Sequence, residues 1–260
     1  MKERIITALI GILIVIPIIL YGSWPFTIAV YLLATIALFE LIRMFKIENL
    51  FIISLSFIFL WSFIYFQQDY TFTKFTIDSK GLIIFYLLIL LLMVVFSKNK
   101  FTVNDVSRLL FAIIFIGFSF QYMLFVRQFG LHLFLFILFV IWATDSGAYF
   151  IGKRFGKRKL WPAISPNKTI GGAIGGIVVA LIVANVFEIF YSLGLSFFVL
   201  NGIALLISIF GQIGDLVASS MKRAYEIKDF GNLFPGHGGV LDRLDSFIFV
   251  LLLLQMLQLF

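Results

Sequence analysis

The sequence predicts an all-α, polytopic integral membrane protein with about nine transmembrane helices. Of its 260 residues, 62% are hydrophobic and 13% are charged, and the mean hydropathy is +1.11. A soluble domain contains about 45–50% apolar and about 25% charged residues. The apolar runs are continuous, whereas the strands of a membrane β-barrel alternate apolar and polar residues. The composition therefore excludes an ordinary soluble enzyme and disfavours a barrel.

Nine apolar segments are long enough, or nearly so, to cross a bilayer, which takes about 20 residues per helix. Their predicted bounds are roughly 5–22, 25–45, 50–67, 81–97, 108–126, 131–151, 169–191, 196–221 and 243–260. The first is expected to be a retained helix and not a cleaved signal peptide, because no small-residue cleavage site follows it. Short loops then account for most of the remaining chain.

The basic residues lie mainly on one side of this predicted topology. Seventeen of the 20 Lys and Arg residues fall at the N-terminus and in alternate loops, and the other side holds only Lys74, Lys80 and Arg127. Cytoplasmic loops of membrane proteins carry such an excess of Lys and Arg. We therefore expect a multi-pass protein of the cytoplasmic (inner) membrane, with its N-terminus and the loops at 152–168 and 222–242 in the cytoplasm.

The residues that can do chemistry gather in the second half of the chain. Residues 1–130, whose apolar segments contain few polar groups, are predicted to form a transmembrane scaffold, and residues 131–260 a catalytic region. The sequence has no Cys and only two His, which excludes disulfides, Cys nucleophiles and a multi-His zinc site. Any metal would be held by oxygen atoms, which suits Mg²⁺.

The eighth apolar segment carries a polar stripe with helical spacing. Arg223 adjoins this stripe, which consists of Ser208, Gln212, Asp215, Ser219 and Lys222. A carboxylate inside a spanning helix costs about 2.5–3.5 kcal/mol by insertion scales. Either a metal ion or a basic partner must offset this cost for Asp215. The stripe therefore indicates a functional carboxylate or, alternatively, a salt bridge that fixes helix packing.

A glycine-rich turn precedes the ninth segment, in the run Phe234-Pro235-Gly236-His237-Gly238-Gly239-Val240-Leu241-Asp242-Arg243-Leu244-Asp245. Its glycines let backbone N–H groups converge on an anion. Asp242 and Asp245 are spaced i,i+3 and share one face of the following helix. Carboxylates beside such a turn are typical of a Mg²⁺–nucleotide site. The alternative is that both carboxylates only compensate the helix dipole.

Further candidates flank the loop before the seventh segment. Asp145 lies near the cytoplasmic end of the sixth segment, and its alternative is an interfacial residue in contact with water. The basic run at 157–159 is interpreted either as part of the site or as a topology signal against anionic lipid. Thr169 is expected to cap the seventh helix, with Lys168 at its N-terminus. Close helix packing is predicted for the small-residue pairs formed by Gly171, Gly172, Gly175 and Gly176.

These residues resemble the signature of the phosphatidate cytidylyltransferase (CDP-diacylglycerol synthase) family. Every fixed position of that signature is filled between 219 and 245, in the runs Ser219-Ser220-Met221-Lys222-Arg223, Lys228-Asp229-Phe230-Gly231 and 234–245. Two further runs resemble other motifs of the family, namely Ser165-Pro166-Asn167-Lys168-Thr169 and Asp145-Ser146. The resemblance covers residues 140–250, and the N-terminal half matches only in being hydrophobic.

The resemblance implies a transfer of the cytidylyl group from CTP to phosphatidate, which gives CDP-diacylglycerol and pyrophosphate in phospholipid synthesis. It implies a requirement for Mg²⁺, admits a second cation, and implies a membrane-embedded homodimer. We expect no nucleic acid among the partners. The expected mechanism is a direct in-line displacement, because the phosphatidate phosphate is already an anionic nucleophile.

Site roles follow from the same resemblance. The carboxylates of Asp215, Asp242 and Asp245 are expected to hold the metal. The expected catalytic set consists of Asp215, Asp242, Asp245, Lys222 and Arg223. The expected substrate-binding set consists of Ser165, Lys168, Ser219, Lys228, His237, Gly238, Gly239, Arg243 and Asp145.

Two other functions stay open from the sequence. The chain could transfer the same group to another phospho-lipid, such as an isoprenoid ether lipid, and only the lipid groove would distinguish this case. From another class, a membrane transporter could use charged residues along a pathway. A transporter would more naturally show interrupted helices in two related halves, whereas here the polar residues cluster in one half.

Overall fold

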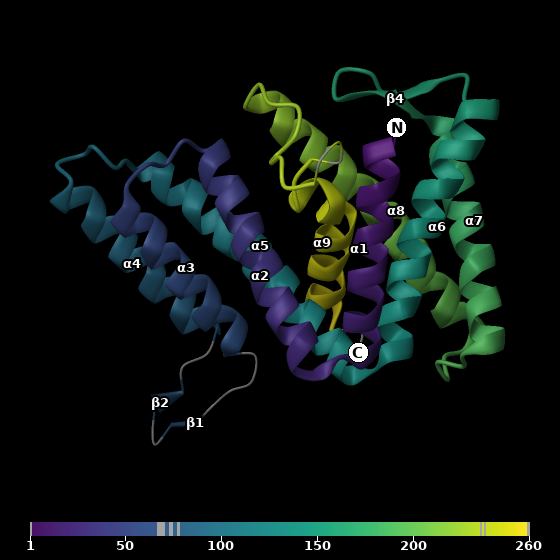
Figure 1. Ribbon diagram of the computed structural model, residues 1–260, viewed down its shortest axis with the longest axis horizontal. Helices are drawn as coiled ribbons and strands as arrows, with labels where there is room; N and C mark the ends of the chain where they lie inside the picture. Colours follow the sequence, from purple (N-terminus) through teal and green to yellow (C-terminus); the bar gives the residue numbers. More distant parts are fainter. Residues whose placement is uncertain are drawn as a thin grey trace. The chain divides into compact units, whose positions relative to one another are not determined.

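The computed structural model is all-α apart from two short hairpins (Figure 1). It describes residues 2–66, 71–72, 75–76, 79–234, 236 and 238–258. Within this part of the chain the helices are α1 (Lys2–Tyr21), α2 (Ser23–Met44), α3 (Leu50–Tyr65), α4 (Ser79–Phe96), α5 (Val103–Phe129), α6 (Leu131–Phe155), α7 (Ile170–Phe190), α8 (Phe197–Ala224) and α9 (Leu241–Leu257). The antiparallel hairpins are β1 (Thr71–Phe72) with β2 (Phe75–Thr76), and β3 (Lys159–Trp161) with β4 (Ser165–Thr169).

Each predicted apolar segment falls on one of these helices, with bounds that differ by a few residues. Six of the described helices, α2 and α4 to α8, are long and apolar enough to cross a membrane. Helix α3 has 16 residues and α9 has 17, which is shorter than a straight span of about 20. The prediction of an all-α, multi-pass membrane protein is confirmed, and the count of nine spans and their orientation stay predictions.

The chain forms two compact units. The first contains Met1–Phe125 together with Asp229–Leu241, and the second contains Val126–Lys228 together with Asp242–Phe260. The predicted division at residue 130 lies close to the first of these boundaries. The segment Asp229–Leu241, which contains the glycine-rich turn, belongs to the unit of the N-terminal helices.

Buried polar groups join the helices of the first unit. The hydroxyls of Ser56 on α3 and Tyr86 on α4 lie 2.7 Å apart and share a hydrogen bond. Gln121 Nε2 on α5 donates to the carbonyl oxygen of Phe63 on α3 over 3.1 Å. The Phe63 ring packs on Gly117, where a Cβ atom would lie 2.8 Å from it. These contacts suit the predicted scaffold role.

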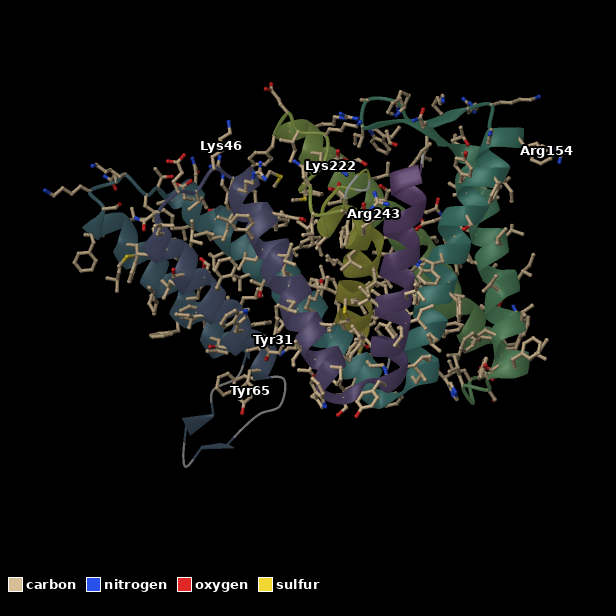
Figure 2. All side chains as sticks on the ribbon, viewed as in Figure 1. Tyr31, Lys46, Tyr65, Arg154, Lys222 and Arg243 are labelled. Atoms are coloured by element: carbon tan, nitrogen blue, oxygen red, sulfur yellow. The ribbon has the colours of Figure 1, made fainter. Side chains whose placement is uncertain are left out.

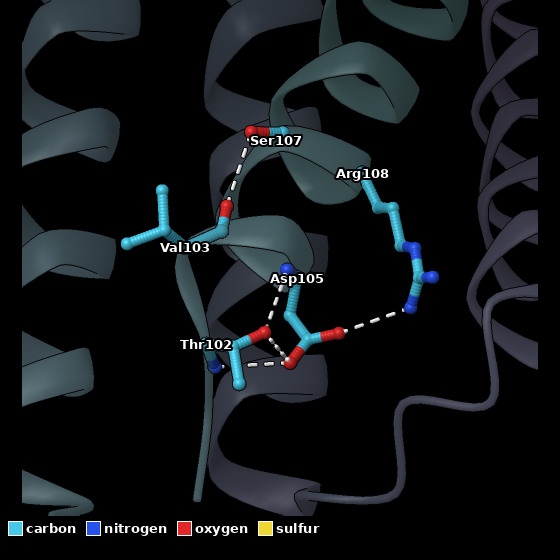
Figure 3. Close-up of polar contacts among 5 residues, drawn as sticks. All are labelled: Thr102, Val103, Asp105, Ser107 and Arg108. Atoms are coloured by element: carbon cyan, nitrogen blue, oxygen red, sulfur yellow. Dashed lines mark hydrogen bonds and ion pairs between the residues drawn. The ribbon is translucent and has the colours of Figure 1, made fainter. Parts of the chain in front are cut away.

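The start of α5 shows how local sequence fixes a helix end (Figure 3). Thr102 N donates to Asp105 Oδ2 over 3.0 Å, and Asp105 N donates back to Thr102 Oγ1 over 3.4 Å. This reciprocal capping box satisfies backbone groups that a helix end leaves without partners. Arg108 Nη1 adds an ion pair to Asp105 Oδ1 at 3.2 Å. Helix α5 therefore begins at Val103, a few residues earlier than its apolar run.

In the second unit, α6 and α7 lie side by side (Figure 1), and at two glycines of α7 the backbones of the helices approach closely. A Cβ atom on Gly172 would lie 2.7 Å from the carbonyl oxygen of Ala148. A Cβ atom on Gly176 would lie 2.7 Å from that of Thr144. The predicted close packing at these glycines is confirmed, and it fixes the distance between the two helices.

Replacing Gly176 by leucine is therefore expected to push α7 away from α6. Overpacking of this kind typically costs about 1–3 kcal/mol of unfolding free energy, and we expect a loss near the upper end because the obstacle is backbone. Unfolding in detergent, followed by circular dichroism, measures the effect. Gly202→Leu on α8 is the matched control, since nothing lies within 4 Å of a Cβ atom there. Equal stability of the two variants would contradict this prediction.

The β3–β4 hairpin connects α6 to α7 and ends in a helix cap. Lys159 pairs with Thr169, and Trp161 pairs with Ser165. Thr169 Oγ1 accepts a hydrogen bond from the N–H of Gly172 over 3.1 Å, which confirms the predicted cap of α7. The hairpin thereby carries Lys168, the residue before the cap, at the start of α7.

Candidate active site

The second unit holds a cavity of about 750 Å³, lined by the hairpin and by α6 to α9. This volume lies within the range of about 300–1,000 Å³ that is typical of ligand pockets. Four carboxylates and four cationic groups line it, so that its formal charge is balanced: Asp145, Asp215, Asp242 and Asp245, with Lys153, Lys159, Lys168 and Arg243. All of these except Lys153 and Lys159 are residues that the sequence analysis selected for the site.

Lys168 reaches from the hairpin to α8. Its Nζ lies 2.5 Å from Asp215 Oδ2 and donates to the carbonyl oxygen of Gln212 over 3.4 Å. Gln212 Nε2 in turn donates to the carbonyl oxygen of Ala173 on α7 over 3.2 Å. The basic partner that the sequence left open as an alternative for Asp215 is thus present. The side chains of Lys168 and Asp215 are 26% and 36% exposed, so a ligand in the cavity can reach both.

A second ion pair joins the end of α8 to the start of α9. Lys222 Nζ lies 2.7 Å from Asp242 Oδ1, and the two side chains are 16% and 2% exposed. Figure 2 shows Lys222 and Arg243 near this junction of the two helices. A cation near a helix C-terminus and an anion near a helix N-terminus both interact favourably with the helix dipoles. The dipole interpretation therefore applies to Asp242, although Asp242 also lines the cavity.

The other two carboxylates come from α6 and α9. Asp145 lines the cavity from α6, eight residues before Lys153, the next charged residue of the lining. Asp245 lines it from the first turns of α9, and its Oδ1 accepts a hydrogen bond from the N–H of Ser246 over 2.7 Å. Three helices of one unit therefore bring four carboxylates, from three separate parts of the sequence, to a single cavity.

The donor atoms of this cavity suit Mg²⁺ in kind, because carboxylate oxygens are the hard ligands that this ion prefers. Among the residues that the structure describes, no three acidic or His side chains are grouped closely enough to hold a metal ion. Asp215 and Asp242 each face a lysine ammonium instead. Metal binding would therefore require these carboxylates to exchange or share their lysine partners.

Seven predicted site residues among those that the structure describes do not line the cavity, namely Lys222, Gly238, Gly239, Arg223, Lys228, Ser219 and Ser165. Arg223 and Lys228 are exposed at and after the end of α8, and Ser219 is half-buried on α8. Ser165 is half-buried at the start of β4, where it pairs with Trp161. Their substrate contacts stay predictions.

The glycine-rich turn belongs to the first unit. Gly238 has a positive φ of 85° and pairs with Phe234, to which it donates over 3.1 Å and from which it accepts over 2.9 Å. The predicted substrate contact of His237 lies outside the described residues. The positive φ explains why glycine suits position 238.

At the end of this turn, backbone amides do converge on an anion, but that anion is part of the protein. The N–H groups of Val240 and Leu241 donate to the two carboxylate oxygens of Glu40 over 2.8 and 2.9 Å. Gly239, which the sequence analysis assigned to substrate, lies against the same carboxylate. These two amides are consequently committed to Glu40, and a phosphate contact from them would need Glu40 to leave.

Sequence reasoning missed several residues of the cavity and of the turn. The cavity is also lined by Lys153, Lys159, Asn167 and Ser246. Lys159 belongs to the basic run at 157–159, which could equally be interpreted as a topology signal. Glu40 was overlooked as well. The available signal was its position as the one acidic residue in the predicted segment 25–45.

Fold and site together define a class: a multi-pass, α-helical membrane protein with a charge-balanced cavity in its second half. A family model described as "Cytidylyltransferase family" matches residues 2–260. The chain therefore belongs to the cytidylyltransferase family, as the signature between 219 and 245 indicated.

Curated relatives agree with this assignment over almost their full length. The phosphatidate cytidylyltransferase of Bacillus subtilis (strain 168) is 44% identical over 255 residues, which cover 96% of this chain and 95% of the relative. That of Staphylococcus haemolyticus (strain JCSC1435) is 43% identical over 257 residues, which cover 99% and 98%. That of Staphylococcus aureus (strain COL) is 41% identical over 257 residues, with the same coverage.

Proposed function

We propose that this protein transfers the cytidylyl group of CTP to phosphatidate, forming CDP-diacylglycerol and pyrophosphate for phospholipid synthesis. Its family and the names of its relatives support this activity. The observation that carries the proposal is the cavity, where four cationic groups can bind phosphates and four carboxylates can bind a cation. Such a cavity in an apolar helical protein suits one anionic nucleotide and one anionic lipid.

In the proposed reaction, a phosphate oxygen of phosphatidate forms a bond to the α-phosphorus of CTP. The bond from that phosphorus to the oxygen bridging to the β-phosphate breaks, and pyrophosphate leaves with the electron pair. The attacking oxygen is already anionic, so no strong base is needed. The protein therefore acts mainly by positioning the two substrates in line and by neutralising their charge.

The residues of the cavity divide into two groups by charge. Lys168 and Arg243, with Lys153 and Lys159, are proposed to bind the phosphate groups through charge-assisted hydrogen bonds. Mg²⁺ is proposed to be held by Asp215 and Asp242, with support from Asp245. The carboxylate oxygens of Asp145 are available as ligands for a second cation. When bound, the metal would neutralise negative charge on the α-phosphate and the departing pyrophosphate.

A lipid-product assay tests this function. The purified protein is incubated in detergent with labelled CTP, Mg²⁺ and either phosphatidate or an isoprenoid ether-lipid phosphate, and the lipid phase is separated by chromatography. Label in CDP-diacylglycerol, with release of pyrophosphate, is the expected result. Label in the ether lipid alone would favour the other acceptor. No labelled lipid with either acceptor would contradict the proposal and return the transporter to consideration.

We also propose that the protein works as a homodimer in the inner membrane, with its site open to the cytoplasm. Apolar helices and bacterial relatives support a multi-pass protein of that membrane. The excess of Lys and Arg in alternate loops supports the orientation. The mass of the purified protein in detergent, measured by light scattering, tests the dimer.

Cysteine labelling tests the orientation, and the chain has no Cys that would interfere. A membrane-impermeant maleimide is expected to label Lys159→Cys, an exposed position of β3, only when it is given access to the cytoplasmic side. It is expected to label Lys80→Cys, an exposed position at the start of α4, only from the outer side. The reverse pattern would overturn the proposed orientation.

A further inference from the structure

Glu40 is a buried acidic residue in a helix that is apolar enough to cross a membrane. It lies on α2, four residues before the end of that helix, and is 4% exposed. An acidic side chain inside a spanning helix is costly unless it has partners. Its neighbours on the helix, Leu38, Leu41 and Ile42, are buried apolar residues, so the stabilising groups come from elsewhere in the fold.

Those groups are the first backbone amides of α9. One carboxylate oxygen of Glu40 accepts a hydrogen bond from Val240 N, and the other accepts one from Leu241 N. Leu241 is the first residue of α9. The first N–H groups of a helix have no partner within it, and a Ser, Thr, Asp or Asn side chain usually caps them. Val240 cannot supply such a cap. Glu40 therefore caps α9 from a position 200 residues earlier in the chain.

The glycines of the surrounding loop leave the space that this carboxylate needs. A Cβ atom on Gly239 would collide with Glu40 Oε1, and one on Gly231 would collide with the same oxygen. Neither glycine has a positive φ, so space and not backbone conformation explains them. The loop before α9 thus leaves space for the Glu40 side chain at Gly231 and at Gly239.

We propose that Glu40 is a positioning residue for the reaction: it fixes the residue at which α9 begins and thereby the placement of Asp242, the next residue of the chain. This inference rests on the proposed function for its effect on activity. A carboxylate is suited to this task because it binds two adjacent amides at once and favours the positive end of the helix dipole. Groups that orient metal ligands typically change metal affinity or activity by about 10–100-fold when they are lost.

The test compares Glu40→Gln, which keeps the size of the side chain and removes its charge, with the wild type. We expect the Mg²⁺ concentration for half-maximal activity to rise by about 10-fold or more, with a smaller change in KM for CTP. The matched control is Glu48→Gln, the same chemical change at an exposed position eight residues further on. Gly239→Ala, which removes space and keeps the charge, is expected to have the same effect as Glu40→Gln, and Gly202→Ala on α8 is its control.

Hydrogen exchange provides a readout that does not depend on activity. A peptide that covers 238–245 is expected to exchange faster in Glu40→Gln than in the wild type, while peptides of α6 and α7 stay unchanged. If Glu40→Gln prevents folding, Glu40→Asp, which keeps the charge on a shorter arm, is measured in its place and is expected to show a smaller shift in the same direction.

Two results would overturn the positioning role. One is wild-type Mg²⁺ dependence together with wild-type exchange in the Glu40 variants. The other is a loss of activity that only follows the folded fraction, with no change in Mg²⁺ dependence. A wild-type protein that forms no CDP-linked lipid would instead refute the proposed function, and the exchange measurement would still decide whether Glu40 caps α9.

Discussion

Replacing Asp215 by asparagine is expected to lower kcat at saturating Mg²⁺ by at least about 100-fold, the loss typical of removing one group that stabilises transition-state charge. The change keeps the size of the side chain and removes the charge that would bind the metal. The ion pair with Lys168 is partly exposed, and such pairs contribute little to stability. The variant should therefore insert, purify and unfold like the wild type, so that loss of turnover reports on chemistry.

Turnover is measured with labelled CTP and phosphatidate over a range of Mg²⁺ concentrations. Asp105→Asn provides the control, because it makes the same chemical change in the capping box of α5. Near wild-type turnover of Asp215→Asn at saturating Mg²⁺ would show that Asp215 serves only in the ion pair with Lys168. The sequence leaves that alternative open, and the contact between Lys168 and Asp215 is consistent with it.

Replacing Lys222 by methionine is expected to lower the unfolding free energy by about 3 kcal/mol or more, because a buried carboxylate then loses its ammonium partner. The side chains of Lys222 and Asp242 are 16% and 2% exposed, so water can compensate little. Thermal unfolding in detergent checks this expectation. Lys100→Met, at an exposed position between α4 and α5, is the control and should leave stability unchanged.

The double variant Lys222→Met with Asp242→Leu separates stability from function. Replacing both members of a buried ion pair by apolar residues is often neutral or stabilising, so we expect most of the lost stability to return. Activity should not return, because Asp242 is proposed to bind the metal. Recovery of turnover together with stability would show that this pair only holds α8 against α9.

The helices could be predicted from the sequence because each is a long apolar run, and lipid leaves few other structures for such a run. The stripe containing Asp215 could be found because its residues share one helix and follow helical spacing. The cap of α7 was equally local, since Thr169 binds an amide three residues later. Features that depend on neighbours within one helix or one turn were therefore open to sequence reasoning.

The partners of these residues could not be predicted, because they depend on folding at a distance. Nothing in the spacing links Lys168 on the hairpin to Asp215 on α8, which lies 47 residues later. The partners of Glu40 were harder still to predict, because they are backbone N–H groups, which every residue type except proline possesses. The glycines near 239 were expected to bind a substrate anion, and that contact stays a prediction. The sequence could not show that the carboxylate of Glu40 lies against Gly239.

The lysine–aspartate pair at the cavity has a consequence for how a nucleotide and a cation bind together. Both members of the Lys168–Asp215 pair line the cavity, so a bound phosphate can interact with the ammonium and a bound cation with the carboxylate. Binding of only one of these ligands would leave the other member of the pair without its counter-charge, which is less favourable than binding both. For the proposed function we therefore expect the binding of nucleotide and cation to be thermodynamically coupled, so that by linkage each strengthens the binding of the other by the same factor.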